Sequence, residues 1–303
     1  MKTIKDVFLN FHQVLDELYG VQETEAITLM VLSEITDLSR AKIKAFPEDD
    51  VPAEAQEKVP AILTELKTGK PIQYILGSTE FYGLPFLVNP ATLIPRPETE
   101  ELVEWALLSL KLKVESQKSF SILDIGTGSG CIAISLKKNL PDAAVTAVDI
   151  SAEALQTARQ NAVINEVDVA FIEVDILQPN HSLLATHHSP LTANHSLLTT
   201  HYSLIISNPP YVTLHDKTLM HTNVTDFEPH SALFVPEDDP LLFYKAIADF
   251  AADKLITGGL LFFEINEAFG KEIIELLANK GFTNIELRKD MSGRDRMVIA
   301  ELR

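Results

Sequence analysis

Apolar side chains in the first part of the chain recur at the spacing of an α-helix. Between residues 4 and 18 they fall three or four positions apart, and Gly20 follows as a helix stop. A second apolar run covers residues 23–38, and Ser39 can cap a short third helix. The pattern predicts consecutive helices with no strand between them.

The same helical spacing continues to residue 76. Residues 53–68 form another amphipathic segment, in which Pro60 predicts a break or a late start. Pro71 suits the beginning of a short helix that ends at Gly77. We therefore expect residues 1–76 to form a small helical domain.

The pattern changes after this region. Residues 79–82 and 85–88 are strand-like and flank Gly83, which predicts a β-hairpin. We interpret residues 77–92 as a hairpin linker and residues 93–303 as a second domain.

From residue 120 strand-like and helix-like segments alternate, which is typical of a parallel sheet. The predicted strands are 121–125, 143–148, 169–174, 202–206, 260–265, 282–288 and 296–302. The predicted helices are 102–112, one beginning at Cys131, 152–164, 240–255 and 270–279. Residues 212–238 form a long polar stretch. Because the connection 289–295 holds no helix, the last strand pair should be antiparallel. The fold class is therefore α/β, with a mostly parallel seven-stranded sheet and an antiparallel last strand.

A low-complexity insertion interrupts this alternation at residues 178–201. Residues 180–187 recur at 194–201 with seven of eight positions identical, and five of the nine histidines lie here. The segment holds no acid or thiol beside those histidines, so we interpret it as a surface loop rather than a metal site.

Composition narrows the class of protein. Hydrophobic residues make up 46% of the 303 residues, enough for a large core, yet no apolar run reaches the ~20 residues of a membrane span. The N-terminus lacks the apolar region of a signal peptide, and Cys131 is the single cysteine. We expect a cytoplasmic protein that is not attached to a membrane.

The net charge of −18 bears on the partner. Residues 1–90 carry 8 basic and 14 acidic side chains, and the remainder carries 17 and 29, so both parts are acidic. Such a chain offers no general attraction for a polyphosphate backbone. Direct binding of nucleic acid is therefore not expected, and a protein with a basic or neutral surface is the better partner.

The first predicted strand of the second domain ends in the sequence DIGTGSG, which runs from Asp124 to Gly130. Its glycines allow a tight turn and let backbone N–H groups approach a ligand closely. Cys131 stands where a dinucleotide-binding turn would place its third glycine. This disfavours a pyrophosphate and favours a ligand whose carboxylate or amine meets the turn.

Two carboxylates close the next two strands. Asp149 ends the second strand, where an acid can accept hydrogen bonds from two ribose hydroxyls. Asp175 ends the third, where an adenine amino group would lie. Each could be an ordinary turn residue, but three such sites at successive strand ends indicate an adenosyl ligand.

The fourth predicted strand is followed by Ser207, Asn208, Pro209, Pro210 and Tyr211. The two prolines end the strand's hydrogen-bond ladder, so Asn208 lies at the carboxyl end of a strand, where open α/β sheets bind ligands. The Asn208 side chain and the Pro209 carbonyl can accept the two N–H bonds of a planar –NH2 group while the Tyr211 ring packs beside it. The alternative is a plain strand-to-loop turn.

Together these motifs resemble class I S-adenosylmethionine-dependent methyltransferases with a Rossmann-like fold. The resemblance is closest to the HemK/PrmC family, which methylates the glutamine side chain of peptide-chain release factors. It rests on DIGTGSGCIAISL, SNPPYV, LIPRPETEEL, IQYILGSTEFYGLPFLV and the tail SGRDRMVIA, and spans nearly the whole chain. The insertion at 178–201 is a departure from the family pattern.

The resemblance implies the roles of individual residues. S-adenosyl-L-methionine would be held by the glycine turn and by acids at the next strand ends, and would leave as S-adenosyl-L-homocysteine. The residues implied for it are Gly126, Thr127, Gly128, Ser129, Gly130, Asp149, Asp175, Ile176 and Asn208. The target glutamine would be held by Asn208, Pro209, Pro210 and Tyr211, of which Asn208, Pro209 and Tyr211 are the candidate catalytic residues.

No metal is required by this chemistry, and no residue is an obvious strong base. In LIPRPETEEL, Pro97 suits a first turn, and we interpret Glu98, Glu100 and Glu101 as stabilising the helix dipole. The resemblance implies a release factor as the protein partner, and we expect a monomer. Two alternatives remain open: a nucleic-acid amino-group methyltransferase, and a silent S-adenosylmethionine-binding module.

Overall fold

The computed structural model describes residues 2–113, 119–178 and 201–303. Residue contacts divide the chain into two compact units: residues 1–78 together with 221–227, and residues 79–220 together with 228–303. We call them the helical unit and the sheet unit. The predicted repeat lies outside the described residues, apart from its last histidine.

The helical unit is built by short helices around one apolar core. Its helices are α1 (Ile4–Tyr19), α2 (Val21–Thr36), α3 (Arg40–Ala45), α4 (Ala53–Leu66), α5 (Ile72–Leu76) and α11 (Thr222–Phe227). The core includes Val7, Phe11, Leu15, Val31, Leu32, Ile43 and Val59. Ser39 caps α3 as predicted, because its side chain accepts a hydrogen bond from the Lys42 N–H at 3.3 Å.

The predicted break at Pro60 is wrong, because α4 runs through it without interruption. Pro60 lies on the exposed side of the helix, whereas Val59, Ile62 and Leu63 around it are buried. Burial of these neighbours holds the helix together although one N–H donor is missing.

The polar stretch at 212–238 holds three short helices that its sequence does not indicate. They are α10 (Leu214–Lys217), α11 and α12 (His230–Leu233). Phe227 at the end of α11 is half-buried and belongs to the helical unit, where a Cβ on Gly69 would lie 4.0 Å from its ring. No pattern in the sequence assigns these residues to the helical unit.

A β-hairpin opens the sheet unit, formed by β1 (Ser78–Phe81) and β2 (Leu84–Leu87). Its turn is centred on Tyr82 and Gly83, one position earlier than predicted, and both residues have positive φ, 52° and 71°. That pair of dihedrals gives the twist a two-residue hairpin needs, and glycine adopts it without strain.

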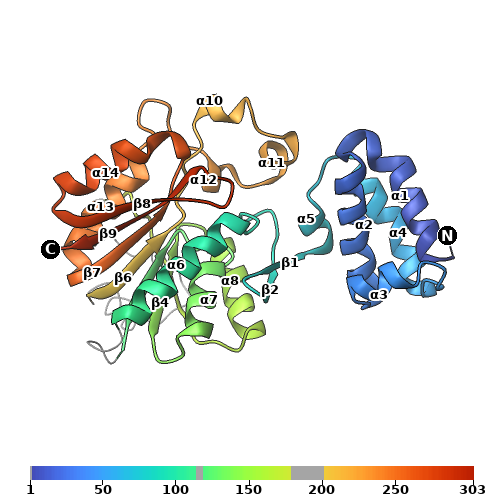
Figure 1. Ribbon diagram of the computed structural model, residues 1–303, viewed down its shortest axis with the longest axis horizontal. Helices are drawn as coiled ribbons and strands as arrows, with labels where there is room; N and C mark the ends of the chain where they lie inside the picture. Colours follow the sequence, from blue (N-terminus) through green and yellow to red (C-terminus); the bar gives the residue numbers. More distant parts are fainter. Residues whose placement is uncertain (1, 114–118, 179–200) are drawn as a thin grey trace. The chain divides into compact units, whose positions relative to one another are not determined.

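A seven-stranded sheet forms the centre of the sheet unit (Figure 1). Its strands are β3 (Ser121–Ile125), β4 (Ala144–Asp149), β5 (Ala170–Glu173), β6 (Tyr202–Ser207), β7 (Leu255–Glu264), β8 (Phe282–Lys289) and β9 (Asp295–Leu302). The order is β5-β4-β3-β6-β7-β9-β8. Pairing is parallel from β5 to β7, and β9 is antiparallel to both β7 and β8. The predicted fold class is confirmed.

Helices cover both faces of this sheet. α6 (Pro97–Lys113), α7 (Cys131–Asn139) and α8 (Ala152–Ile164) lie on one face, and α13 (Leu242–Lys254) and α14 (Gly270–Asn279) on the other (Figure 1). Side chains alternate between the two cores along each strand: Leu204 packs with α6 and α7, and Ile205 with α13. A 3₁₀ turn, η1 (Glu267–Phe269), precedes α14.

The order in which strands are added to the sheet reverses at β3. β4 and β5 are added on one side of β3 and β6 on the other, so the loops after β3 and β6 separate. Open α/β sheets bind ligands in the crevice formed there. In the described parts of the chain, no helix is both long and apolar enough to cross a membrane.

Candidate active site

The glycine turn after β3 has the conformation its sequence predicts. Gly126, Gly128 and Gly130 all have positive φ, from 54° to 83°. The N–H groups of Gly126 and Thr127 bond to the Val148 carbonyl at 2.9 and 3.0 Å, which ties the turn to the end of β4. This backbone shape is closed to most side chains, so the glycines are required by geometry.

Asp149 and Asp175 lie at the ends of neighbouring strands, as the sequence predicts. The Asp149 carboxylate accepts hydrogen bonds from the N–H groups of Gly128 at 2.8 Å and Ser151 at 2.9 Å. Burial raises the pKa of Asp149, and these N–H groups lower it. Asp175 accepts from the Leu177 N–H at 2.9 Å. Both carboxylates are therefore held in place by backbone.

A cavity of about 340 Å³ joins these loops, and we call it the glycine-loop cavity. Its lining includes Gly126, Gly128, Asp149, Ile150, Asp175, Ile176, Asn208, Pro209 and Pro210. A Cβ added at Gly126 or Gly128 would meet nothing within 4 Å, so the turn leaves open space beside its backbone. Ile150 is 54% exposed and was not anticipated from the sequence.

Three residues implied for the cofactor do not line this cavity. Thr127 turns inward, and its hydroxyl donates to the Asp124 carboxylate at 2.6 Å. Burial raises the pKa of Asp124 to about 7. Ser129 is buried, and Gly130 packs against α7 and α8, where a Cβ would lie 2.9 Å from Ile134 Cδ1. These three residues therefore support the turn and do not line the cavity.

The loop after β6 borders a second cavity of about 330 Å³, which we call the tyrosine cavity. Leu93, Asn208, Pro209 and Ala232 line both cavities, so the two meet at this loop. Tyr211 lines the tyrosine cavity, whereas Pro210 lines only the glycine-loop cavity. In the described chain, no donor is paired with the side-chain oxygen of Asn208 or the carbonyl of Pro209.

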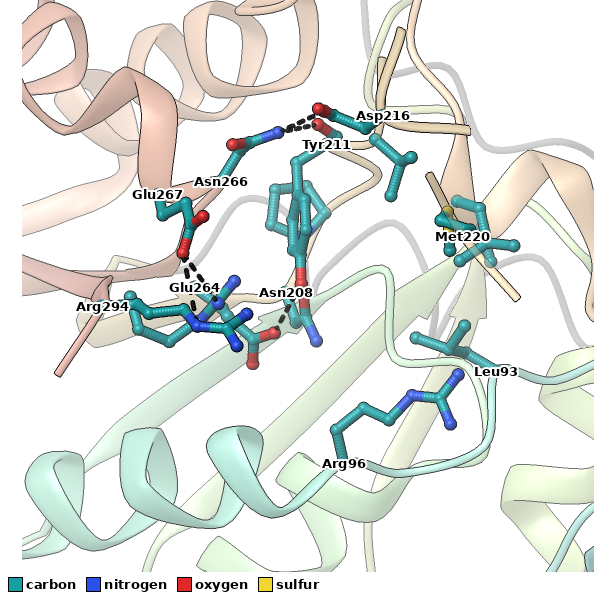
Figure 2. Close-up of a pocket in the computed structure, with 15 residues that line it drawn as sticks. Leu93, Arg96, Asn208, Tyr211, Asp216, Met220, Glu264, Asn266, Glu267 and Arg294 are labelled. Carbon is teal, nitrogen blue, oxygen red and sulfur yellow. Dashed lines mark hydrogen bonds and ion pairs between the residues drawn. The ribbon is translucent and has the colours of Figure 1, made fainter. Parts of the chain in front are cut away.

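A buried carboxylate that was not predicted from the sequence lies in the tyrosine cavity. Glu264 ends β7 and is 1% exposed, and the Tyr211 hydroxyl donates to its Oε1 at 3.1 Å (Figure 2). Burial raises the pKa of Glu264, while hydrogen bonds from Thr99 and Tyr211 lower it. Burial beside Glu264 also raises the pKa of Tyr211. An acid that closes an apolar strand, as Asp149 and Asp175 do, was the signal in the sequence.

The LIPRPETEEL segment also reaches this site. Thr99 in the first turn of α6 donates its hydroxyl to Glu264 at 2.6 Å, and the Asn208 amide donates to Thr99 at 3.2 Å. Two of the acids we assigned to the helix dipole bind backbone instead: Glu100 accepts from the Tyr82 N–H at 2.8 Å and Glu101 from the Met291 N–H at 3.2 Å. Dipole stabilisation alone is therefore an incomplete interpretation of these acids.

Three guanidinium groups line the tyrosine cavity, and each is paired with an acid. Arg96 bonds to buried Glu228 at 2.5 Å, Arg294 lies 3.7 Å from Glu267, and Arg296 bonds to Asp290 at 3.1 Å. Figure 2 shows Arg294 directed toward Glu267. The cavity is therefore charged but internally neutralised, which does not suit a phosphate backbone.

The fold and the two cavities define a class of protein. The architecture is that of class I methyltransferases, and one solved structure with this fold, the delta-N METTL16 MTase domain, matches with a TM-score of 0.50 over 78% of this chain and 96% of that chain at 18% identity. Residues 106–226 match the model of the methyltransferase small domain, and residues 10–77 match that of the PrmC N-terminal domain.

Curated relatives identify the family. A release factor glutamine methyltransferase of Flavobacterium psychrophilum is 46% identical over 300 residues, covering 99% of both chains. Another, of Bacteroides thetaiotaomicron, is 40% identical and covers 95% of this chain and 96% of its own. The chain belongs to the release factor glutamine methyltransferase family, and the resemblance stated from its motifs is confirmed.

Proposed function

We propose that this enzyme transfers a methyl group from S-adenosylmethionine to the side-chain amide nitrogen, N5, of a glutamine in a peptide-chain release factor. The observation that carries the proposal is the position of Asn208. It lines both cavities, its amide nitrogen donates to Thr99, and its side-chain oxygen has no donor among the described residues.

The glycine-loop cavity fits S-adenosylmethionine. Open space beside Gly126 and Gly128 lets a ligand approach the backbone of the turn closely, and Asp149 offers a carboxylate for two ribose hydroxyls. Asp175 and Ile176 would flank the adenine, with Ile150 as an apolar surface. When bound, S-adenosylmethionine supplies a methyl group from a positively charged sulfur and leaves as S-adenosylhomocysteine.

The tyrosine cavity fits the target side chain. The Asn208 oxygen and the Pro209 carbonyl would accept the two N–H bonds of the glutamine amide, and the Tyr211 ring would pack beside it. An amide nitrogen is a weak nucleophile because its lone pair is delocalised. Two fixed acceptors align the nitrogen for in-line attack and stabilise the positive charge that develops on it. One N–H proton then leaves to water.

A nucleic-acid amino group is the competing substrate, because NPPY also suits adenine or guanine. The ion-paired arginines of the tyrosine cavity and the net charge of −18 both disfavour it. A silent binding module is disfavoured by the acceptors on Asn208 and Pro209 that no donor in the described parts of the chain occupies, because such a module would not need them.

The decisive experiment uses purified enzyme, S-adenosylmethionine with a labelled methyl group, and three substrates offered separately: a release factor, ribosomal RNA and duplex DNA. We expect label only in the release factor, on one glutamine located by peptide mass mapping. Label in either nucleic acid but not in the protein would overturn the proposal. Absence of label in all three, with cofactor binding intact, would support the silent module.

For residues 1–76 we propose substrate recognition, because every site residue follows position 90. A chain that begins at Thr79 should bind cofactor but methylate an intact release factor poorly. Equal methylation by both chains would require another role for the helical unit. A monomeric, cytoplasmic enzyme remains the expectation from the sequence.

A further inference from the structure

We propose that Thr99 and Glu264 are positioning residues that fix which end of the Asn208 amide faces the substrate. The inference rests on the proposed function, in which Asn208 accepts an N–H bond of the target glutamine. The two ends of an asparagine amide are similar in size but opposite in hydrogen bonding, since the oxygen only accepts and the nitrogen only donates. Their orientation must therefore be set by a neighbour.

The neighbour is a chain of two hydrogen bonds. The Asn208 Nδ2 donates to Thr99 Oγ1 at 3.2 Å, and the Thr99 hydroxyl donates to Glu264 Oε2 at 2.6 Å. Thr99 is 3% exposed and Glu264 1% exposed, so water has little access to either. The fold brings Asn208 and Glu264 together because they directly follow Ser207 and Phe263, which are paired in the parallel β6–β7 ladder.

The direction of this chain follows from the groups in it. A threonine hydroxyl has one hydrogen, and an ionised carboxylate can only accept. As a carboxylate, Glu264 accepts at both oxygens, one from Thr99 and one from Tyr211. The 2.6 Å distance is that of a hydrogen bond to a charged oxygen. Thr99 has thus used its only hydrogen and can only accept from Asn208, so the Asn208 oxygen must face away from it.

Glu264 also fixes the far end of the loop after β6. Its Oε1 accepts from the Tyr211 hydroxyl, and the Tyr211 carbonyl accepts from the Asn266 amide at 3.1 Å. One carboxylate therefore orients the amide at the start of the NPPY loop and the ring at its end. Without it, Asn208 could rotate and present its –NH2 to the –NH2 of the substrate, where two donors oppose each other.

The test compares variants of Thr99 on the full-length enzyme. Thr99→Val keeps the shape and removes the hydroxyl, and Thr99→Ser restores it. We expect Thr99→Val to lower kcat on a release factor by about 10- to 100-fold, less than loss of the Asn208 acceptor itself. The Kd for S-adenosylhomocysteine, measured by calorimetry, should stay within about twofold, and Thr99→Ser should recover most of kcat.

Thr157 provides a matched control. It is also a buried threonine that accepts from an asparagine amide, Asn89 Nδ2 at 2.8 Å, and donates to a carbonyl, that of Glu153 at 3.3 Å, but it lines neither cavity. Thr157→Val should leave kcat nearly unchanged. An equal fall in kcat for Thr157→Val and Thr99→Val would show a general packing effect and overturn the inference.

Glu264→Gln tests whether the charge of Glu264 sets the direction of these hydrogen bonds, because it keeps the size of the side chain and removes its charge. We expect kcat to fall as in Thr99→Val, and the double variant to fall no further, since both act through one chain. Folding is followed by the fluorescence of Trp105, the single tryptophan; if Glu264→Gln does not fold, the Thr99 variants decide.

Asn208→Ala separates the two possible failures. If Asn208→Ala is inactive while Thr99→Val keeps full kcat, the positioning role is wrong and the proposed function stands. If Asn208→Ala itself keeps full kcat, Asn208 does not hold the substrate amide and the positioning role is wrong with it; if the unaltered enzyme places no methyl group on a release factor, the proposed function is wrong.

Discussion

The two cavities that meet at Asn208 are built in different ways. The glycine-loop cavity takes its shape from backbone: glycine turns, N–H groups, and strand-end carboxylates that are themselves held by N–H groups. The tyrosine cavity takes its shape from long side chains that hold one another through hydrogen bonds and ion pairs. A backbone site suits a ligand common to many enzymes, whereas a side-chain site can be changed to select one substrate.

The sequence distance between the contributing residues differs as well. The glycine-loop cavity is lined mainly by residues that directly follow β3, β4, β5 and β6. The tyrosine cavity combines the start of α6, the loop after β6, the end of β7 and the start of β9. Substitutions should therefore have local effects in the first cavity and coupled effects in the second.

The largest effect is expected at the residue shared by both cavities. Asn208→Ala should lower turnover on a release factor by roughly 10²–10³-fold, because one preorganised contact to the transition state is lost. Asn208→Asp should also be impaired, since it places a charge where a neutral amide is needed. The Kd for S-adenosylhomocysteine should change much less. Near-full turnover of Asn208→Ala would reduce this residue to an ordinary turn.

A second comparison concerns two glycines of the same turn, Gly126 and Gly130. Gly130→Ala should destabilise the sheet unit by about 2–4 kcal/mol, because it adds left-handed strain to a clash with Ile134 and Ala158. Gly126→Ala meets open space and should lose only the strain of about 1–2 kcal/mol, but its methyl group enters the cavity and should weaken cofactor binding. Urea unfolding followed at Trp105 measures both. Equal stability losses would contradict the assignment of Gly130 to packing.

A substitution at Asp149 tests whether the strand-end carboxylates of the glycine-loop cavity bind the cofactor. Asp149→Ala should weaken S-adenosylmethionine binding by about 1–3 kcal/mol, the result of leaving ribose hydroxyls without a partner. Asp142→Ala, at an exposed position, is the control and should bind normally. Calorimetry with both variants decides, and unchanged affinity in Asp149→Ala would remove this residue from the site.

The smallest effect is expected at Ser151. Its hydroxyl caps α8 by accepting from the Ala154 N–H at 3.1 Å, while its own N–H holds Asp149. Ser151→Ala keeps the backbone donor, so stability should fall by about 1 kcal/mol with little change in cofactor Kd. A large loss of affinity would mean that side chains, and not backbone, shape this cavity.

Local patterns in the sequence were sufficient for the fold class and for one cavity. Alternating strand and helix segments specified the seven-stranded sheet, since each buried strand needs a cover on both faces. The glycine turn, Asp149 and Asp175 each follow a strand directly, and carboxyl ends of parallel strands share one edge of the sheet. Asn208 was found for the same reason.

Residues joined only by the fold could not be found this way. Thr99 and Glu264 stand 165 positions apart, and their contact depends on α6 packing beside β7. Pro60 was misjudged because burial of its neighbours outweighs its missing donor. Residues 221–227 join the helical unit through packing that leaves no periodic pattern. The sequence thus determined which segments become strands, helices and turns, because these depend on near neighbours; the tertiary structure decided which distant side chains share a hydrogen bond, because that depends on how whole elements pack.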